Sequence, residues 1–139
     1  MAYLTPAEIA SHLKDEIVAL VQTGYATALQ EAIDAAISEM RGYISFYDIE
    51  TILATTGSNR EPILLLFTKD IAVWHFIQLA NPNVDMELRE TRYNKAIAWL
   101  RDVQKGIAVP NLPLAVNADE TVQTGKIKFG SNPKRNTQY

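Results

Sequence analysis

The chain has 139 residues, of which 47% are hydrophobic and 21% are charged, and its formal net charge is −3. This length suits one domain with a sizeable core, and the composition is that of an ordered soluble protein rather than a disordered one. The chain contains no cysteine, which excludes disulfides and thiolate zinc sites.

Capping signals and apolar spacing predict three helices in the first 45 residues. Thr5-Pro6-Ala7-Glu8 is a capping box with proline at the first helical position, so a helix begins at Pro6. A second, short helix covers residues 17–21, and Gly24 marks its end. The third is the clearest, because the apolar residues of 29–44 keep i, i+3, i+4 spacing for over four turns.

Two further helices are predicted after a loop at residues 46–60, which contains one helical turn at residues 49–54. The fourth helix covers residues 60–79 and is apolar on nearly every side, so we expect it at the centre of a bundle, as a core helix rather than a membrane span. The fifth follows the capping residue Asp85, presents one apolar stripe between Tyr93 and Val103, and ends at Gly106. We expect six residues at the centre of the core: Leu66, Phe67, Ile71, Trp74, Ile97 and Leu100.

The search for catalytic chemistry favours a protein that is not an enzyme. His12 and His75 fall on different helices without a second metal ligand at i+4, so the simpler expectation is a surface histidine and a core histidine bonded to a polar neighbour. Glu31 and Asp34 lie on the polar face of their helix, where a solvated surface explains them. The sequence has no G-x-S-x-G motif and no phosphate-binding glycine loop, so we expect no cofactor and no small-molecule substrate.

Asp70 is unusual because it lies inside the apolar fourth helix, where a buried carboxylate is costly unless it is paired. One interpretation is an acid in a pocket. The favoured interpretation is a structural bond to an arginine or tyrosine of the fifth helix, such as Arg92 or Tyr93.

The chain changes character at Pro110, which divides a helical bundle at residues 1–109 from an extended arm at residues 110–139. Up to Ala115 the chain carries 9 basic and 14 acidic residues, a charge of −5, and the remainder carries 4 basic and 2 acidic residues, a charge of +2. The predicted fold is therefore all-α, a compact bundle of about five helices followed by a C-terminal arm with little regular structure. Within the arm, Lys126-Ile127-Lys128-Phe129 alternates as a strand does, and a lone strand needs a partner.

The arm has three possible interpretations. It can be a solvated tail, or it can bind phosphates as part of a small nucleic-acid-binding or DNA-packaging accessory protein. Docking onto a partner protein is favoured, because the arm combines cations with apolar anchors and the body is acidic. The residues expected to bind a partner are Lys126, Ile127, Lys128, Phe129, Lys134 and Arg135.

Five motifs in a fixed order carry a resemblance to a known family. They are Ala2-Tyr3-Leu4-Thr5-Pro6, Gly42-Tyr43-Ile44, Asp70-Ile71-Ala72, Tyr93 with Ala96-Ile97-Ala98-Trp99-Leu100, and the closing Lys128-Phe129-Gly130-Ser131-Asn132-Pro133-Lys134-Arg135. In this order the chain resembles the Mu-like prophage head–tail connector family. Residues 47–57 depart from that family, many of whose members have a tight, proline-rich turn there.

The resemblance implies a structural virion protein: an all-helical adaptor without a cofactor that forms a ring between portal and tail and completes the head. Its partners would be further copies of itself together with portal and tail-completion proteins. DNA would pass through the ring without being specifically bound, and no membrane would be involved. The expected location is the host cytoplasm during assembly and then the head–tail junction of the virion.

Overall fold

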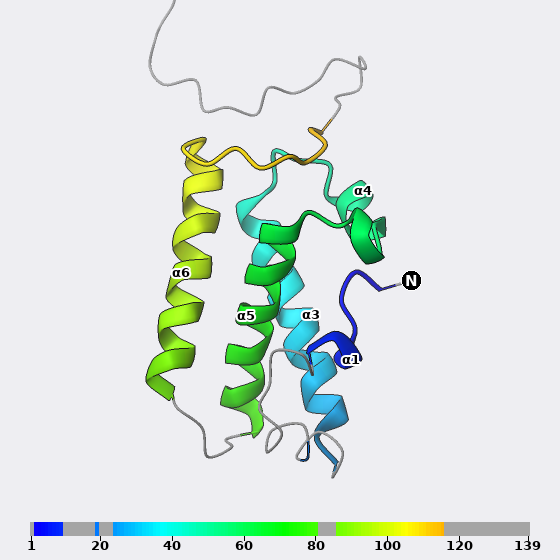
Figure 1. Cartoon of the computed structure of the whole chain (residues 1–139), viewed down its shortest axis with the longest axis vertical. Helices are drawn as coiled ribbons and strands as arrows, with labels where there is room; N and C mark the ends of the chain where they lie inside the picture. The colour runs from blue at the N-terminus through cyan, green and yellow to red at the C-terminus, as the bar shows by residue number, and fades with distance from the viewer. Residues whose placement is uncertain (1, 10–18, 20–23, 81–85, 116–139) are drawn as a thin grey trace, which may run out of the picture.

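The computed structural model describes residues 2–9, 19, 24–80 and 86–115, and the elements in these ranges are helices. They are α1 (Pro6–Ile9), α3 (Ala26–Tyr43), α4 (Ile49–Ala54), the 3-10 helix η3 (Gly57–Asn59), α5 (Pro62–Ala80) and α6 (Met86–Lys105). The three long helices α3, α5 and α6 run side by side (Figure 1). The all-helical prediction is thus confirmed. The helix expected at residues 17–21 lies outside the described residues, except for Ala19.

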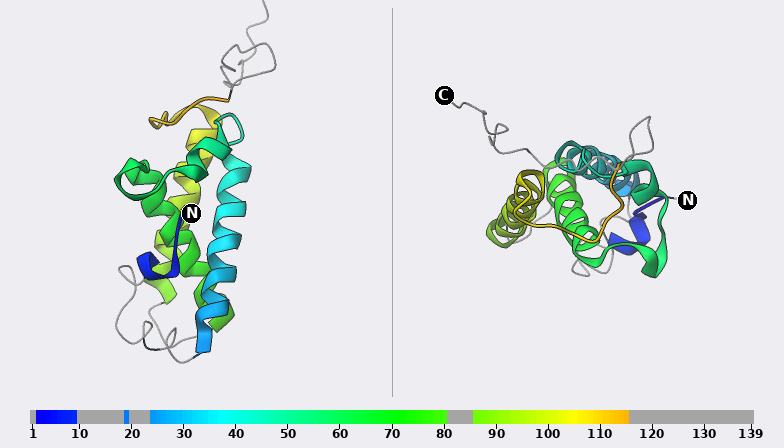
Figure 2. Two further views of the ribbon diagram at one scale, coloured as in Figure 1. Left: turned by 90° about the vertical axis from the view of Figure 1, so that its right-hand side faces the viewer. Right: turned by 90° about the horizontal axis from the view of Figure 1, so that it is seen from above.

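Helix α5 is the middle element of the bundle. It packs against both α3 and α6, while α3 and α6 share far fewer contacts with each other, and α1 covers part of α3 and α5 (Figure 2). Its buried side chains point in several directions around the helix axis, which is the arrangement expected of a helix with neighbours on more than one side. They are Leu64, Thr68, Asp70, Ile71, Ala72, Val73, Phe76 and Ile77.

The predicted core is correct for three residues and wrong for one. Ile71, Ile97 and Leu100 are buried, whereas Leu66 is 42% exposed. Leu66 lies two positions after the buried Leu64, and two residues turn an α-helix by about 200°, so it points away from the neighbour that covers Leu64.

Phe67 and Trp74, also expected at the centre, are only partly buried and form the seam between α5 and α6. Phe67 packs against Trp99 with 5.3 Å between ring centroids. Trp74 stacks on Tyr93 at 5.5 Å with an interplanar angle of 26°. These tilted and offset ring pairs stabilise the α5–α6 contact beyond the area that they bury.

The ends of the helices match their local signals. The Thr5 amide donates to Glu8 Oε2 at 3.0 Å, so Glu8 closes the predicted capping box and α1 begins at Pro6. The short helix predicted at residues 49–54 is α4, and Asp48 caps it by accepting a hydrogen bond from the Thr51 amide. Glu31 and Asp34 are exposed on α3, as predicted.

By length and composition alone, the window Pro62–Leu79 of α5 is apolar enough to cross a membrane. In the bundle, 44% of this window is buried by protein, and core helices of soluble proteins have the same composition.

We predict that two leucines on the first turns of α5 contribute very differently to stability. Leu64→Ala removes a fully buried side chain and should lower the free energy of unfolding by about 2–5 kcal/mol. Leu66→Ala, in the same helix, should lower it by less than about 1 kcal/mol, because 42% of its surface is already exposed to water. Urea unfolding of both variants measures this difference, and equal losses would contradict the core described above.

Candidate assembly surface at one end of the bundle

The segment after α6 crosses one end of the bundle and is called the strap here (residues 107–115). Gly106 has φ 81°, its amide donates to the Val103 carbonyl at 3.1 Å, and the Ile107 amide donates to the Asp102 carbonyl at 2.8 Å. This is a Schellman motif, which ends the helix as predicted and turns the chain sideways. The strap then passes from α6 over the start of α5 toward α4 (Figures 1 and 2).

The strap pairs with the loop between α3 and α4. The Asp48 amide donates to the Pro113 carbonyl at 2.8 Å, and the Ala115 amide donates to the Phe46 carbonyl at 3.1 Å. These two bonds flank an antiparallel bridge between Tyr47 and Leu114. The loop at residues 46–48 thus supplies an extended partner for the start of the arm.

Apolar side chains remain uncovered at this end of the bundle. Ile107 and Val109 of the strap are 72% and 68% exposed, and Leu114 is 38% exposed. Ile63 and Leu66, on the first two turns of α5, are 43% and 42% exposed. Exposed apolar groups that gather in one region are typical of a surface that binds another protein.

The opposite end of the bundle also carries exposed apolar residues. Tyr25 lies just before α3, Leu79 near the end of α5, and Met86 and Leu88 at the start of α6. Since α3 and α6 run in the direction opposite to α5, these residues lie at the far end from the strap (Figure 1).

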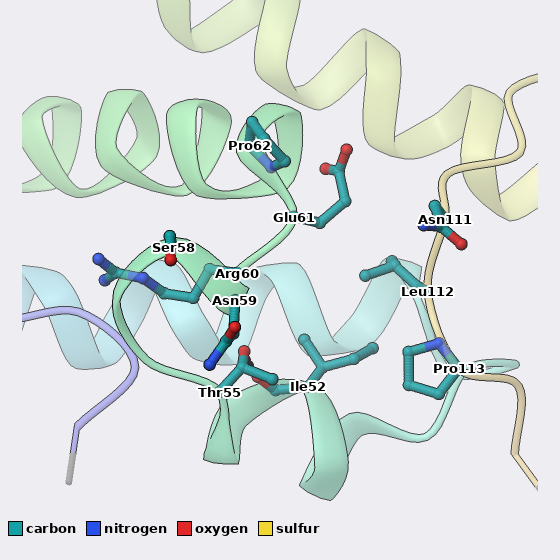
Figure 3. Close-up of a pocket in the computed structure, with 10 residues that line it drawn as sticks. All are labelled: Ile52, Thr55, Ser58, Asn59, Arg60, Glu61, Pro62, Asn111, Leu112 and Pro113. Atoms are coloured by element: carbon teal, nitrogen blue, oxygen red, sulfur yellow. Dashed lines mark hydrogen bonds between the residues drawn. The ribbon is translucent and has the colours of Figure 1, made fainter.

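A cavity of about 300 Å³ lies between the strap and the segment that joins α4 to α5 (Figure 3). Its lining comes from Ile52 of α4, from Thr55 just after that helix, from residues 58–62 and from residues 111–113. Leu112 points from the strap toward the middle of the cavity (Figure 3). A cavity of this volume is at the small end of the range for ligand sites, and it suits one or two side chains better than a cofactor.

Glu61 brings a negative charge to this cavity for a local reason. Its Oε2 atom accepts a hydrogen bond from the Leu64 amide at 2.7 Å, so the carboxylate caps the start of α5. Pro62 occupies the first helical position, where its missing N–H costs nothing. The need for a helix cap thus places a carboxylate in the cavity wall.

Arg60, the residue before Glu61, is held by the N-terminal segment. Its guanidinium donates to the Tyr3 carbonyl at 2.7 Å, to the Gly57 carbonyl at 3.0 Å and to Glu8 Oε1. The hydrogen bond from Arg60 lowers the pKa of Glu8 to about 2, and burial raises the pKa of Tyr3 to about 12. The positive charge of Arg60 is therefore used within the fold.

A second polar cluster joins the three long helices. His75 Nε2 of α5 lies 2.8 Å from Glu39 Oε2 of α3, and the Tyr93 hydroxyl of α6 donates to Glu39 Oε1 at 2.7 Å. Burial, followed by the bond to Glu39, raises the pKa of Tyr93 to about 12, so its hydroxyl remains a donor at neutral pH. The polar neighbour predicted for His75 is present, although the histidine is only partly buried.

Asp70 is buried, with 8% of its surface exposed, and it faces cations of α6. Burial raises the pKa of Asp70, and the charges of Arg92 and Arg89 lower it. The Tyr93 hydroxyl donates to Glu39 instead. Arg92 and the buried Arg89 are both arginines of the helix from which a partner of Asp70 was expected.

The six residues expected to bind a partner, Lys126, Ile127, Lys128, Phe129, Lys134 and Arg135, lie outside the described residues, as does His12. Among the residues that the structure describes, no group of three or more His, Cys, Asp or Glu side chains is placed to hold a metal ion. Comparison with models of known protein families, with curated proteins and with solved structures returned no match.

We predict that the Glu8–Arg60 pair makes stability depend on pH in the acid range. A folded-state pKa of about 2, below the ordinary 4.5, stabilises the fold above pH 4.5, and this stabilisation is lost as the pH falls toward 2. Glu8→Gln keeps a capping side chain but removes the charge, and it should cost about 1–2 kcal/mol at neutral pH, since solvent screens a side chain that is 31% exposed.

Urea unfolding of both proteins at neutral pH and near the acid end measures this effect. The two free energies of unfolding should converge as the pH falls, because the wild-type carboxylate then becomes neutral as well. A difference between the proteins that stays constant with pH would show that the pair does not act through its charge.

Proposed function

We propose that this protein is a structural head–tail connector of a tailed phage, which forms a ring between portal and tail-completion proteins and so completes the head. The observation that carries the proposal is the distribution of exposed apolar residues. They gather at both ends of the bundle, and at one end the chain continues from the strap into the cationic arm. A protein placed between two partners needs a binding surface at each end.

A closed ring requires that one face of each subunit meets a different face of the next. The strap end offers exposed Ile107 and Val109, and the body up to Ala115 is acidic while the remaining chain is basic. Opposite charges of this kind guide the approach of one subunit to the next, and apolar side chains hold the contact. A contact of ordinary size would bury on the order of 1,600 Å².

The proposed role is mechanical and uses no catalytic residue, cofactor or small-molecule substrate. The clusters around Glu39 and Arg60 are explained by the fold, since each fastens segments that are distant in sequence. DNA would pass through the ring without specific binding, because acidic bodies around it repel phosphates. The protein would act in the host cytoplasm during assembly and remain at the head–tail junction of the virion.

We predict that the purified full-length protein assembles into rings. Light scattering coupled to size exclusion should give the mass of a closed oligomer, and negative-stain images should show rings with a central opening. If the protein is instead a monomer that shifts the mobility of DNA, with an affinity that falls steeply with salt, the nucleic-acid-binding alternative would be favoured over the connector.

We also predict that two truncations only five residues apart behave differently. A chain of residues 1–115 keeps the strap and should remain folded and helical but fail to form rings. A chain of residues 1–110 loses both backbone bonds to residues 46–48 and the cover provided by Leu112, so its free energy of unfolding should fall by a further ~1–3 kcal/mol. Circular dichroism during urea unfolding and light scattering measure the two properties. Rings formed by residues 1–115 would exclude a role of the arm in assembly.

A further inference from the structure

The cavity beside the strap has both apolar and polar side chains in its lining. Its apolar walls come from α4, the start of α5 and the strap, and they are formed by Ile52, Pro62, Leu112 and Pro113. Its volume of about 300 Å³ suits an apolar side chain such as phenylalanine. An apolar side chain that enters such a cavity leaves water and gains close packing, which is how anchor residues act in protein interfaces.

Charged residues of the lining affect which residues can flank the bound side chain. Glu61 lines the cavity and its carboxylate caps α5, while the guanidinium of the neighbouring Arg60 bonds to Tyr3 and Glu8 and points away from the cavity (Figure 3). Because Arg60 is paired with Glu8, the charge of Glu61 favours an apolar residue flanked by lysine over one flanked by an acid.

We propose that the cavity of each subunit binds residues 126–129 of a second copy, with Phe129 as the anchor and a flanking lysine beside Glu61. This sequence, Lys-Ile-Lys-Phe, alternates cations with apolar residues as the cavity requires. The proposal rests on the ring proposed above. Cavity and peptide are different surfaces of one chain, so a head-to-tail contact leads on to the next copy and forms a ring when the rotation between copies closes.

The length of the chain permits this contact. Eleven residue steps separate Ala115, at the end of the strap, from Lys126, and an extended chain covers about 36 Å over that distance. A bundle three helices wide measures roughly 20–30 Å across, so the arm reaches past its own body. The strap itself forms one wall of the cavity. An arm bound from a neighbouring copy would therefore also contact the strap, from which the subunit's own arm continues.

The absence of cysteine from the chain allows a direct test by disulfide trapping. One full-length variant carries Asn111→Cys at the exposed rim of the cavity, and a second carries Gly130→Cys, which leaves residues 126–129 intact. The two variants are mixed and oxidised, and cross-linked dimers are measured on a non-reducing gel. The matched control pairs Gly130→Cys with Asp34→Cys, an exposed position on the side of α3.

The expected result is several-fold more dimer with the rim cysteine than with the control, and loss of that excess when Phe129→Ala or Glu61→Lys is added. Equal cross-linking of rim and control, or an excess that persists in Phe129→Ala, would overturn the proposal. A chain with both cysteines that forms only the internal disulfide would overturn it as well, because the cavity would then bind its own arm.

Light scattering of the unmodified protein separates this inference from the proposed function. Rings without specific cross-linking would support the proposed connector function and refute the proposed docking site. Specific cross-linking between copies without rings would support the docking site and refute the ring.

Discussion

Helix α5 sets the constraint on which the rest of the structure depends, because it has no polar stripe to present to water. Its buried residues point in several directions around the axis, so one neighbour cannot cover them. Helices α3 and α6 therefore lie on different sides of it, and the polar contacts of Glu39 with His75 and Tyr93 hold all three together. One side of the first turns of α5 is left without a neighbour, which leaves Ile63 and Leu66 exposed near the strap.

Local features of the fold could be predicted because they depend on residues close together in the sequence. The capping box at Thr5, the helix at residues 49–54 and the stop at Gly106 each follow from neighbours within a few positions, and each is found in the structure. Burial in α5 was harder to predict, since periodicity says nothing about a helix that is apolar all round. Leu66 was therefore placed in the core although it lies on an uncovered side.

The candidate surface could not be predicted, because contacts between distant segments create it. Arg60 bonds to Tyr3 across 57 positions, and Asp48 bonds to Pro113 across a still longer separation. Neither pair has a local signature, since an arginine after a turn and a proline in a tail are common. The cavity exists only after these contacts have brought α4, the start of α5 and the strap together. The sequence feature that points to this region is Glu61-Pro62 before an apolar run, a pattern typical of a capped helix start.

The strap determines how costly it is for the arm to bind a partner. Pro110 and Pro113 restrict the backbone of the strap, and the Schellman motif at Gly106 and the bonds to residues 46–48 fasten both of its ends. Ordering flexible residues opposes binding, so a fixed starting point reduces the number of residues that must lose freedom when the arm docks. In the proposed ring, the same fixed point would give every arm one direction of departure. Pairing the start of the arm with its own body is thus compatible with the proposed binding further along the chain and would favour it.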